Sequence, residues 1–366
     1  MTPVIMPERD LSEIANEFAV GGEFRQAVLY GHGHINETYC AIFDRAGLPV
    51  HCILQRINHN IFRDPVALME NVERVTDHLS AQLTDHPDRE RHTLTLIPDR
   101  AGRTLYVDPA GGYWRAYQFI ERARTYDAIE SAQQAYEGAR AFGRFIEMLA
   151  DLPAPRLHDT IPDFHHGPKR FRALEDAVAR DVAGRVCDAG PEIAFAVAHQ
   201  SVTISLLNAG LPERVTHNDT KINNVLIDDL SGEGICVIDL DTVMPGLAAY
   251  DFGDLVRTAT CTAAEDERDL SRVTMCMDLF EALARGFLSS AGSRLTRAEK
   301  ESLVLGGKLI TLLIGIRFLT DFLNGDAYFK VHRPGHNLDR CRTQFKLVES
   351  IEAQESKMQQ FVRSIG

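Results

Sequence analysis

The chain has 366 residues, of which 45% are hydrophobic and 25% charged, so it can bury the core of two domains or of one large two-lobed unit. Its net charge of −13 argues against nucleic acid and anionic membranes as partners, since both are bound by clustered Lys and Arg. It does not exclude a nucleotide, whose phosphates need only a few local cations and metal ions.

The seven cysteines are scattered and form no C-x-x-C pair, which argues against a disulfide scaffold or a zinc site. The first residues lack the basic region and the apolar run of a signal peptide. The most apolar stretch, residues 303–316, contains Lys308 and is too short to span a bilayer, so we expect a buried helix there. We therefore expect a cytoplasmic protein without a membrane partner, acting as a monomer or a weak dimer.

The first third of the chain has the pattern of strands interrupted by one helix. Gly31 and Gly33 mark a turn between the first two strands. Asp64 and Pro65 have the pattern of an N-cap and a first helical residue, and apolar residues then follow at helical spacing to about Leu83. Strands are expected at residues 27–30, 38–43, 51–57, 94–98 and 113–120.

From about residue 121 the pattern changes to long amphipathic helices with two short apolar strands. Helices are expected at residues 131–152, 171–188, 191–207, 266–290 and 296–323, and strands at residues 225–228 and 235–240. The fold class is therefore α+β, with a small lobe of residues 1–120 and a larger, mostly helical lobe of residues 121–366.

The strongest chemical signal is the pattern H-x-D-x-K-x-x-N, which begins at His217 and precedes an apolar strand. Phosphoryl transfer uses a carboxylate that accepts or orients the proton of the acceptor hydroxyl, and a neutral oxygen ligand for magnesium a few residues later. Asp219 and Asn224 have that spacing, and Lys221 between them can neutralise charge on the transferred group. Asp or Asn before a strand often only forms a turn, but the combination favours catalysis.

Asp239 ends the second apolar strand, where a carboxylate is well placed for a metal ion. Magnesium prefers oxygen ligands, so we expect Asp239 and Asn224 to bind it. Asp241 follows on the same strand face and competes with Asp239 for this role.

The tripeptide Asp251-Phe252-Gly253 has the spelling of the metal-binding motif of kinases, but it does not follow a strand. We expect a helix to begin there, with Asp251 in its first turn holding the backbone of the loop around Asp219.

The turn from Gly31 to Asn36 is a candidate phosphate-binding loop. Backbone N–H groups in such a turn can point at phosphate oxygens, although Asn36 replaces the third glycine of G-x-G-x-x-G and an ordinary hairpin turn is the alternative. The chain has no Walker A sequence, which disfavours a P-loop fold.

Together these motifs resemble the aminoglycoside phosphotransferase and choline kinase superfamily, which has the protein-kinase fold, and within it the bacterial N-acetylhexosamine 1-kinases. The likeness extends from the glycine turn to near residue 350. The segments that carry it are residues 33–36, 53–55, 215–226, 238–246, 251–254, 317–319 and 336–338.

The resemblance implies a two-lobed fold in which the antiparallel sheet of residues 1–120 covers ATP and residues 121–366 bind the acceptor. It implies that Asp219 is the catalytic base, assisted by Lys221, and that Asn224 and Asp239 hold Mg²⁺. The phosphate loop then contains Gly31, Gly33, His34 and Asn36, and the adenine hinge contains Gln118, Phe119 and Ile120.

One position departs from the pattern of the superfamily. Kinases of this fold usually carry Lys on the third strand, paired with a helix Glu, whereas here Gln55 stands at that position and Arg56 lies on the opposite strand face. Glu70 or Glu73 is the candidate helix partner, but Gln55 cannot form an ion pair. We expect Gln55 to contact the nucleotide, and magnesium, Lys221 or other residues to neutralise its phosphates.

The acceptor is expected to be a neutral sugar, which needs several fixed polar groups rather than a counter-ion. Arg317 and Asp321 are four residues apart and share one helix face, where an exposed salt bridge is the alternative. Candidate acceptor ligands are His34, Thr216, Asp219, Arg317, Asp321 and Tyr328.

The resulting hypothesis is an ATP- and Mg²⁺-dependent kinase for the anomeric C1 hydroxyl of N-acetylglucosamine or N-acetylgalactosamine. A kinase of another small hydroxylated metabolite or of an aminoglycoside, and a nucleotide-binding pseudokinase, remain alternatives.

Overall fold

The computed structural model describes residues 8–31 and 35–366, and their contacts divide the chain into two compact units. The first unit runs to Ala123 and also includes Leu152–Ile161 and Ile238–Val243. The second comprises Arg124–Asp151, Pro162–Val237 and Met244–Gly366. Two short segments from the later chain thus pack with the first unit.

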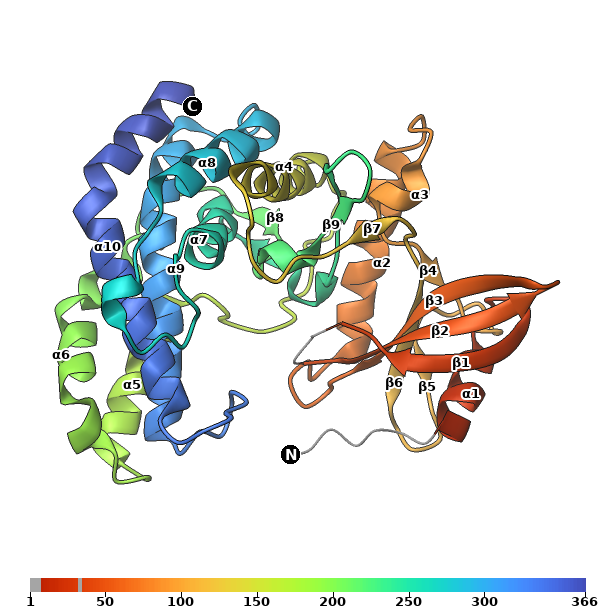
Figure 1. Ribbon diagram of the computed structural model, residues 1–366, viewed down its shortest axis with the longest axis horizontal. Coiled ribbons are helices and arrows are strands. Elements are labelled where there is room, and N and C mark those ends of the chain that lie inside the picture. The colour runs from red at the N-terminus through yellow and green to blue at the C-terminus, as the bar shows by residue number, and fades with distance from the viewer. Residues whose placement is uncertain (1–7, 32–34) are drawn as a thin grey trace. The chain divides into compact units, whose positions relative to one another are not determined.

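The first unit is built on an antiparallel sheet with strand order β1-β2-β3-β6-β4, and β5 pairs with β6 (Figure 1). Its helices are α1 (Glu8–Glu17), α2 (Pro65–Gln82) and α3 (Arg89–His92). Its strands are β1 (Glu23–Leu29), β2 (Glu37–Arg45), β3 (Leu48–Ile57), β4 (Leu96–Ile97), β5 (Tyr106–Val107) and β6 (Tyr113–Gln118). The expected strands are confirmed, while α1 and α3 were not predicted.

The two faces of this sheet differ in character because successive residues of a strand point to opposite faces. On one face, Leu11 of α1 and Phe18, which follows that helix, pack with Tyr39 and Trp114 in a buried apolar cluster. On the other face, Gln55 of β3 lies directly opposite Thr38 of β2 and Arg115 of β6 in the strand register. This second face therefore carries polar groups in the interior of the unit.

The helix α2 begins as the sequence predicts. Asp64 is the N-cap, and its side chain accepts a hydrogen bond of 3.0 Å from the backbone N–H of Ala67, while Pro65 is the first helical residue. The helix ends at Gln82 with Leu83 as its C-cap, as expected. Local capping chemistry predicted its start, and the helical spacing of apolar residues predicted its end.

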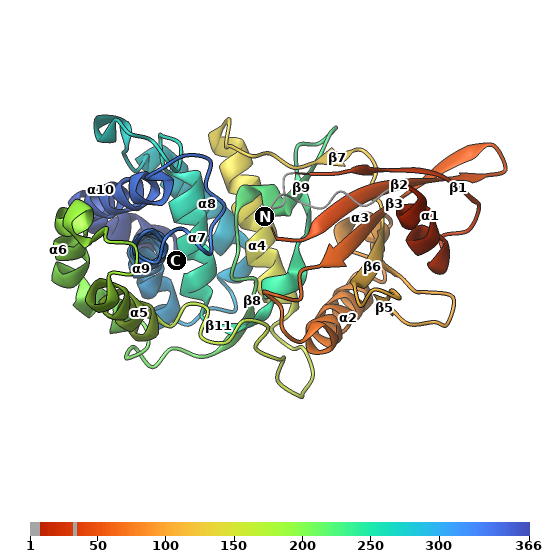
Figure 2. The ribbon, with the colours of Figure 1, turned by 90° about the horizontal axis from the view of Figure 1, so that it is seen from below.

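The second unit is mostly helical (Figure 2). Its helices are α4 (Ala132–Met148), α5 (Gly167–Arg180), α6 (Gly190–Ala198), α7 (Ala248–Ala259), α8 (Met277–Ala291), α9 (Arg297–Leu323) and α10 (His336–Ile365). Short strands form two antiparallel pairs, β9 (Val225–Asp228) with β10 (Gly234–Val237) and β8 (Arg214–Thr216) with β11 (Met244–Gly246). The strand β7 (Ala123–Arg124) adds to the first pair, which becomes a three-stranded sheet of order β10-β9-β7.

The central helix α9 corrects one expectation. Its bounds are close to the predicted residues 296–323, and with 27 residues it could by length and composition cross a membrane. However, 72% of its most apolar window is buried inside the protein, where Ile310, Leu312 and Ile316 are inaccessible to solvent. The expectation of a buried core helix is confirmed, and the expectation that it is too short was wrong.

Other helices differ from the prediction: α4 and α6 end at Met148 and Ala198, before the predicted ends at residues 152 and 207. The helix α5 ends at Arg180, because Asp181 adopts a left-handed backbone conformation. The helix α8 starts at Met277, eleven residues after the predicted start at Asp266. The last helix α10 was not predicted, and it packs along α9 (Figure 1).

Candidate functional site

The loop of residues 217–221 connects β8 to a short 3-10 turn, Ile222–Asn224, and then to β9. Thr216, His217 and Asn224 are buried, so the loop is fixed at both ends. Asn218 has a positive φ of 65°, a conformation that Asn tolerates better than most residues. The loop thus presents Asp219 from a closely held backbone.

The carboxylate of Asp219 has two side-chain partners within this loop. Lys221 Nζ lies 2.8 Å from Oδ1 and 3.1 Å from Oδ2, and Asn224 Nδ2 donates to Oδ2 at 3.2 Å. Burial alone would raise the pKa of Asp219, but Lys221 and His217 hold it below its ordinary value. Asp219 is therefore ionised at neutral pH, as a proton acceptor must be.

Asp251 holds the backbone of the same loop. It lies in the first turn of α7 and accepts hydrogen bonds from the backbone N–H of His217 at 2.9 Å and of Asn218 at 2.7 Å. The carbonyl of Asp251 also accepts from the Thr220 hydroxyl at 2.5 Å. The prediction that the Asp-Phe-Gly aspartate lies in a helix and anchors this loop is confirmed.

A buried ion pair between Arg257 and Asp254 lies close to Lys221. Arg257 donates to Asp254 at 2.8 Å and to Glu265 at 3.1 Å. Burial lowers the pKa of Lys221, but the negative charges of Asp219 and Asp254 raise it above its ordinary value. The pair between Lys221 and Asp219 is therefore fully charged.

A second group of side chains adjoins the loop through His165. The Nε2 of this buried histidine lies 3.1 Å from the carbonyl of Asn218, next to Asp219. Burial lowers the pKa of His165 to about 4, so the ring is neutral and its Nε2–H donates to the carbonyl. The ring also packs against Phe164 and Tyr250.

Two arginines meet at Phe164. The guanidinium carbon of Arg317 lies 5.4 Å from the Phe164 ring centre and 5.7 Å from that of Tyr328, while Arg170 donates to the Phe164 carbonyl at 2.9 Å. Burial, and then the charge of Arg317, lower the pKa of Arg170 to about 10. Arg317 is hydrogen-bonded to Tyr328, and in the described part of the chain neither arginine forms a salt bridge with a carboxylate.

Asp321 and Thr216 bond to backbone groups. The two Asp321 oxygens accept from the N–H groups of Tyr328 and Phe329 at 2.8 and 2.9 Å, so Asp321 holds the segment that packs against Arg317. The Thr216 hydroxyl donates to the Met244 carbonyl at 3.1 Å. Direct acceptor contacts by Asp321 and Thr216 stay predictions.

The first unit contains the other candidate residues. Asp239 is exposed, follows β10 by two residues and has a positive φ of 61°. Asp241 is instead buried, with Oδ1 2.5 Å from Arg115 Nη1 and Oδ2 accepting from Asn36 Nδ2 at 2.6 Å. Of the two carboxylates, Asp239 is the one accessible to a cation.

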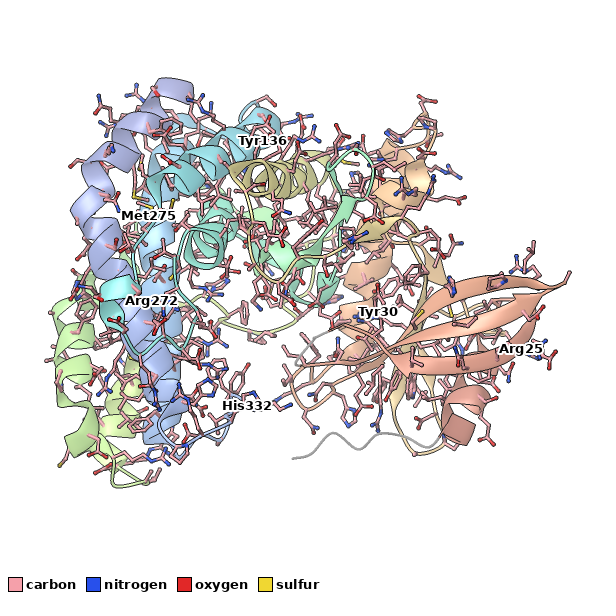
Figure 3. The ribbon with its side chains drawn as sticks, viewed as in Figure 1. Arg25, Tyr30, Tyr136, Arg272, Met275 and His332 are labelled. Atoms are coloured by element: carbon pink, nitrogen blue, oxygen red, sulfur yellow. The ribbon has the colours of Figure 1, made fainter. Side chains whose placement is uncertain are left out.

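The turn after β1 is described only in part. Gly31 has a φ of +75° and open space where a side chain would lie, and the preceding Tyr30, labelled in Figure 3, packs its ring against Phe119. Gly33 and His34 lie outside the described residues. Gln118 is exposed at the end of β6 and Ile120 is buried, and their adenine-hinge role stays a prediction.

Gln55 is bound to a residue that the sequence analysis did not identify. Its Oε1 accepts from both Nε and Nη2 of Arg115, at 3.0 and 2.9 Å, and its Nε2 donates to Thr38 at 3.0 Å. Glu70 and Glu73 do not reach this cation. Glu70 pairs with His158, and Glu73 accepts from Thr104.

The chemistry of Asn224 and Asp239 suits magnesium. Asn224 donates to Asp219 through its Nδ2, so the Oδ1 of Asn224 is the atom left to act as an oxygen ligand. Asp239 supplies a carboxylate. No group of three or more His, Cys, Asp or Glu side chains forms a metal site within residues 8–31 and 35–366. Mg²⁺ is usually bound by one or two carboxylates together with phosphates and water, and Asn224 and Asp239 are the residues that would hold it.

Sequence reasoning missed Arg115, His165, Arg170 and Arg257. Arg115 and Arg170 lie in segments without a recognised motif, so their spacing carried no signal. The one available signal for Arg257 was its position three residues after Asp254 on a predicted helix face.

Comparison with known families gives a match over most of the chain. The model of the phosphotransferase enzyme family matches residues 27–275. A shorter stretch of 147 residues is 31% identical to a proteasome-associated ATPase of Stackebrandtia nassauensis, but it covers 34% of this chain and only 24% of that protein.

Solved structures share the fold over nearly the whole chain. A microcompartment-associated aminopropanol kinase has a TM-score of 0.55 at 17% identity and covers 96% of this chain and 98% of its own. Spectinomycin phosphotransferase with ADP and spectinomycin has a TM-score of 0.59 at 13% identity, over 96% and 99%. A choline kinase from Cryptosporidium parvum Iowa II has 0.56 at 13%, over 97% and 98%. The two-lobed kinase-like α+β fold class is thereby confirmed.

Proposed function

The chain belongs to the phosphotransferase enzyme family and so transfers a phosphoryl group to a hydroxyl of a small molecule, and we propose that ATP with Mg²⁺ is the donor and an N-acetylhexosamine the acceptor. The hydroxyl phosphorylated is the anomeric one, at C1 of N-acetylglucosamine or N-acetylgalactosamine. The observation that carries the proposal is the ionised Asp219 carboxylate, with the guanidinium groups of Arg170 and Arg317 near Phe164.

Asp219 accepts the proton of the attacking hydroxyl in this proposal. Its two partners, Lys221 and Asn224, hold the carboxylate in one orientation, and general-base help of this kind typically contributes about 10²- to 10⁴-fold to the rate. Mg²⁺, held by Asn224 and Asp239, supplies charge neutralisation at the phosphates. Residues 1–120 cover the nucleotide through the glycine turn and the segment from Gln118 to Ile120, and residues 121–366 bind the acceptor, in the cytoplasm.

Arg170 and Arg317 support a neutral acceptor over a cationic one. Both lie near His165, which contacts the carbonyl of Asn218 next to Asp219, and neither forms a salt bridge within the described residues. Choline, aminopropanol and aminoglycosides carry a positive charge at neutral pH, which two nearby guanidinium groups repel. A guanidinium can instead donate to the acetamide carbonyl and the ring hydroxyls of a sugar.

The rings around Arg317 complete the argument for a sugar. Phe164, Tyr328 and Phe329 surround its guanidinium with centroid distances of 5.4, 5.7 and 5.4 Å, and Tyr328 is 56% exposed. An exposed aromatic ring next to fixed hydrogen-bond donors offers one apolar and one polar surface. A sugar ring has the same two kinds of surface, C–H groups and hydroxyls.

A screen of acceptors by ADP release tests the proposal. N-acetylglucosamine and N-acetylgalactosamine should release ADP, and their methyl glycosides, in which the C1 oxygen is blocked, should not. If choline or kanamycin is used better than both sugars, the acceptor assignment is wrong. If no acceptor releases ADP although ADP binds, the pseudokinase alternative replaces the proposal.

A further inference from the structure

Arg115 is a charged side chain in the interior of the first unit. It lies in the middle of β6, on the sheet face opposite to the buried Trp114, and its side chain is 0% exposed. Its Nε and Nη2 both donate to Gln55, and its Nη1 lies 2.5 Å from Asp241. Two neighbouring strands and the turn after β10 therefore meet at one guanidinium.

Asp241 extends this network to the end of the glycine turn. Its second oxygen accepts from Asn36 Nδ2 at 2.6 Å, and Asn36 Oδ1 in turn accepts from the backbone N–H of Asn58 at 3.0 Å. Asn58 Nδ2 donates to the Ile35 carbonyl at 3.2 Å. A change at Arg115 can therefore reach residues 35 and 36 through two hydrogen-bonded side chains.

The helix α2 does not supply the partner of this cation. Its side chain nearest to the guanidinium is Met69, whose sulfur lies 3.8 Å from Arg115 Nη1. The sequence also contains no lysine before Lys169, so no ammonium group exists in the sheet of this unit. The buried cation of the sheet is Arg115, and its carboxylate comes from the turn of residues 239–241.

The position of this pair matters more than its contribution to stability. A buried ion pair often stabilises a fold no better than apolar residues of the same volume would, because both charges lose their hydration. Asp241, however, is two residues from Asp239, and the charge of Asp239 itself acts on Arg115. The pair therefore fixes the turn that carries the candidate magnesium ligand.

We propose that Arg115 is a positioning residue: paired with Asp241 and oriented by Gln55, it holds Asp239 and the end of the glycine turn ready for a magnesium-bound nucleotide. It takes the place of the strand lysine and helix glutamate of other kinases, with the cation on β6 and the carboxylate after β10. This inference rests on the proposed use of ATP and Mg²⁺. Arg115 itself, being fully buried, does not contact the phosphates in this arrangement.

The first test needs no nucleotide. Hydrogen exchange of the Asn58 amide reports the bond to Asn36 Oδ1, and it should be about tenfold faster in Arg115→Met and in Asp241→Asn than in the wild type. Arg115→Lys, which keeps the charge, should restore part of the protection. Arg25→Met is the matched control, because Arg25 pairs with Asp44 on the exposed part of the same sheet. Equal exchange in all five proteins overturns the inference.

The second test measures magnesium and nucleotide together. Calorimetric titration with ADP at several Mg²⁺ concentrations should show that Arg115→Met needs about tenfold or more Mg²⁺ for half-maximal binding, from the loss of one charge-assisted contact. The KM of the acceptor should stay within twofold. A change in acceptor KM with an unchanged Mg²⁺ requirement contradicts the positioning role.

A compensating variant guards against simple misfolding. If Arg115→Met does not fold, Asp241→Asn keeps the volume of the side chain and serves in its place. In the double variant Gln55→Lys with Arg115→Met, an ammonium on β3 next to Asp241 should recover at least part of the Mg²⁺ affinity, and no recovery counts against the inference. If the wild type binds no Mg²⁺-ADP, the proposed function fails, while the exchange experiment still decides whether Arg115 controls the turn.

Discussion

Asp219 lies between a partly exposed cation and a buried amide. The side chain of Lys221 is 43% exposed, that of Asp219 is 24% exposed, and Asn224 is buried behind them. Solvent and an acceptor can therefore reach the carboxylate from one side, while its other contacts are fixed. In the proposed reaction, Lys221 shares its charge between Asp219 and the transferred phosphoryl group.

Replacing Asp219 by Asn should remove turnover and leave nucleotide binding largely intact. The substitution keeps the size and the contacts of the side chain but removes the proton acceptor, which should lower kcat by about 10²- to 10⁴-fold. Steady-state kinetics and ADP titration measure the two effects separately. Turnover within tenfold of the wild type would exclude Asp219 as the base.

His165 should make the stability of the protein depend on pH. Its pKa is about 4 in the folded state and near 6.5 when unfolded, so the unfolded state binds more protons between these values. The contribution of neutral His165 to the unfolding free energy is therefore full above pH 6.5 and is lost as the pH falls towards 4. His165→Phe should remove this slope, so that the difference in unfolding free energy between the two proteins changes by about 3 kcal/mol over the window.

Denaturant unfolding at several pH values measures that difference. Parallel curves for the wild type and His165→Phe would show that His165 is not buried as a neutral ring.

Single residues also show where sequence reasoning ends. The proximity of Asp219, Lys221 and Asn224 could be predicted, because it depends on spacing within one short segment. The partner of Gln55 could not, because Arg115 is sixty positions away and meets it only through the strand register of β3 and β6. Periodicity places a residue on a face of a strand, but it does not say which strand lies beside it.

At the scale of elements, α7 joins the loop of Asp219 to the helical core. Asp251 in its first turn accepts from two loop N–H groups, and Gly253 packs directly against the backbone of α9. The Asp-Phe-Gly tripeptide thus lies in a helix that holds the loop of Asp219 in place. Its aspartate bonds backbone amides, and its glycine allows a close helix contact.

The substitutions Asp251→Ala and Asp239→Ala should change different properties, the melting temperature in the first case and the Mg²⁺ requirement in the second. Asp251→Ala leaves two buried N–H groups of the loop without an acceptor, at a cost of about 1–3 kcal/mol each, and should lower the melting temperature first. Asp239→Ala should raise the Mg²⁺ requirement and change the melting temperature little, because Asp239 is exposed. If Asp251→Ala shifts the Mg²⁺ titration and Asp239→Ala does not, the metal assignment is wrong.

The contact of α7 with α9 can be tested at Gly253. A Cβ at this position would lie 2.4 Å from the Gly306 carbonyl oxygen, so Gly253→Ala must push the two helices apart. We expect a loss of about 1–3 kcal/mol in unfolding free energy, as in other overpacked cores. Gly190→Ala is the control, because a Cβ there meets open space at the start of α6. Equal stability of the two variants would refute this packing role.

Elements with local capping signals were predicted well, and others were not. Asp64 and Thr296 cap α2 and α9 with side-chain hydrogen bonds, and both are residue types that can be recognised in the sequence as N-caps. The helix α10 begins after Gly335 without a side-chain cap, and it was not predicted. Its stability comes from packing against α9, which the sequence of α10 alone does not contain.

At the scale of the whole molecule, chain order and spatial order differ. Residues 238–243, which carry Asp239 and Asp241, pack with the first unit although they follow β10 of the second. The kinase-like fold class could be predicted, because it depends on a motif and on the sequence of elements. The boundary near residue 121 stays a prediction based on composition. The return of later segments to the first unit depends on long-range contacts that no local pattern encodes.

The central claim is that Asp219 assists transfer of the γ-phosphoryl group from ATP to the anomeric oxygen of an N-acetylhexosamine. Phosphorus NMR of a mixture of enzyme, ATP, Mg²⁺ and N-acetylglucosamine or N-acetylgalactosamine tests it most directly. We predict a new phosphomonoester signal that couples to the C1 proton of the sugar and does not appear with Asp219→Asn. A phosphomonoester coupled to any other sugar position, or the same signal with Asp219→Asn, would contradict the account.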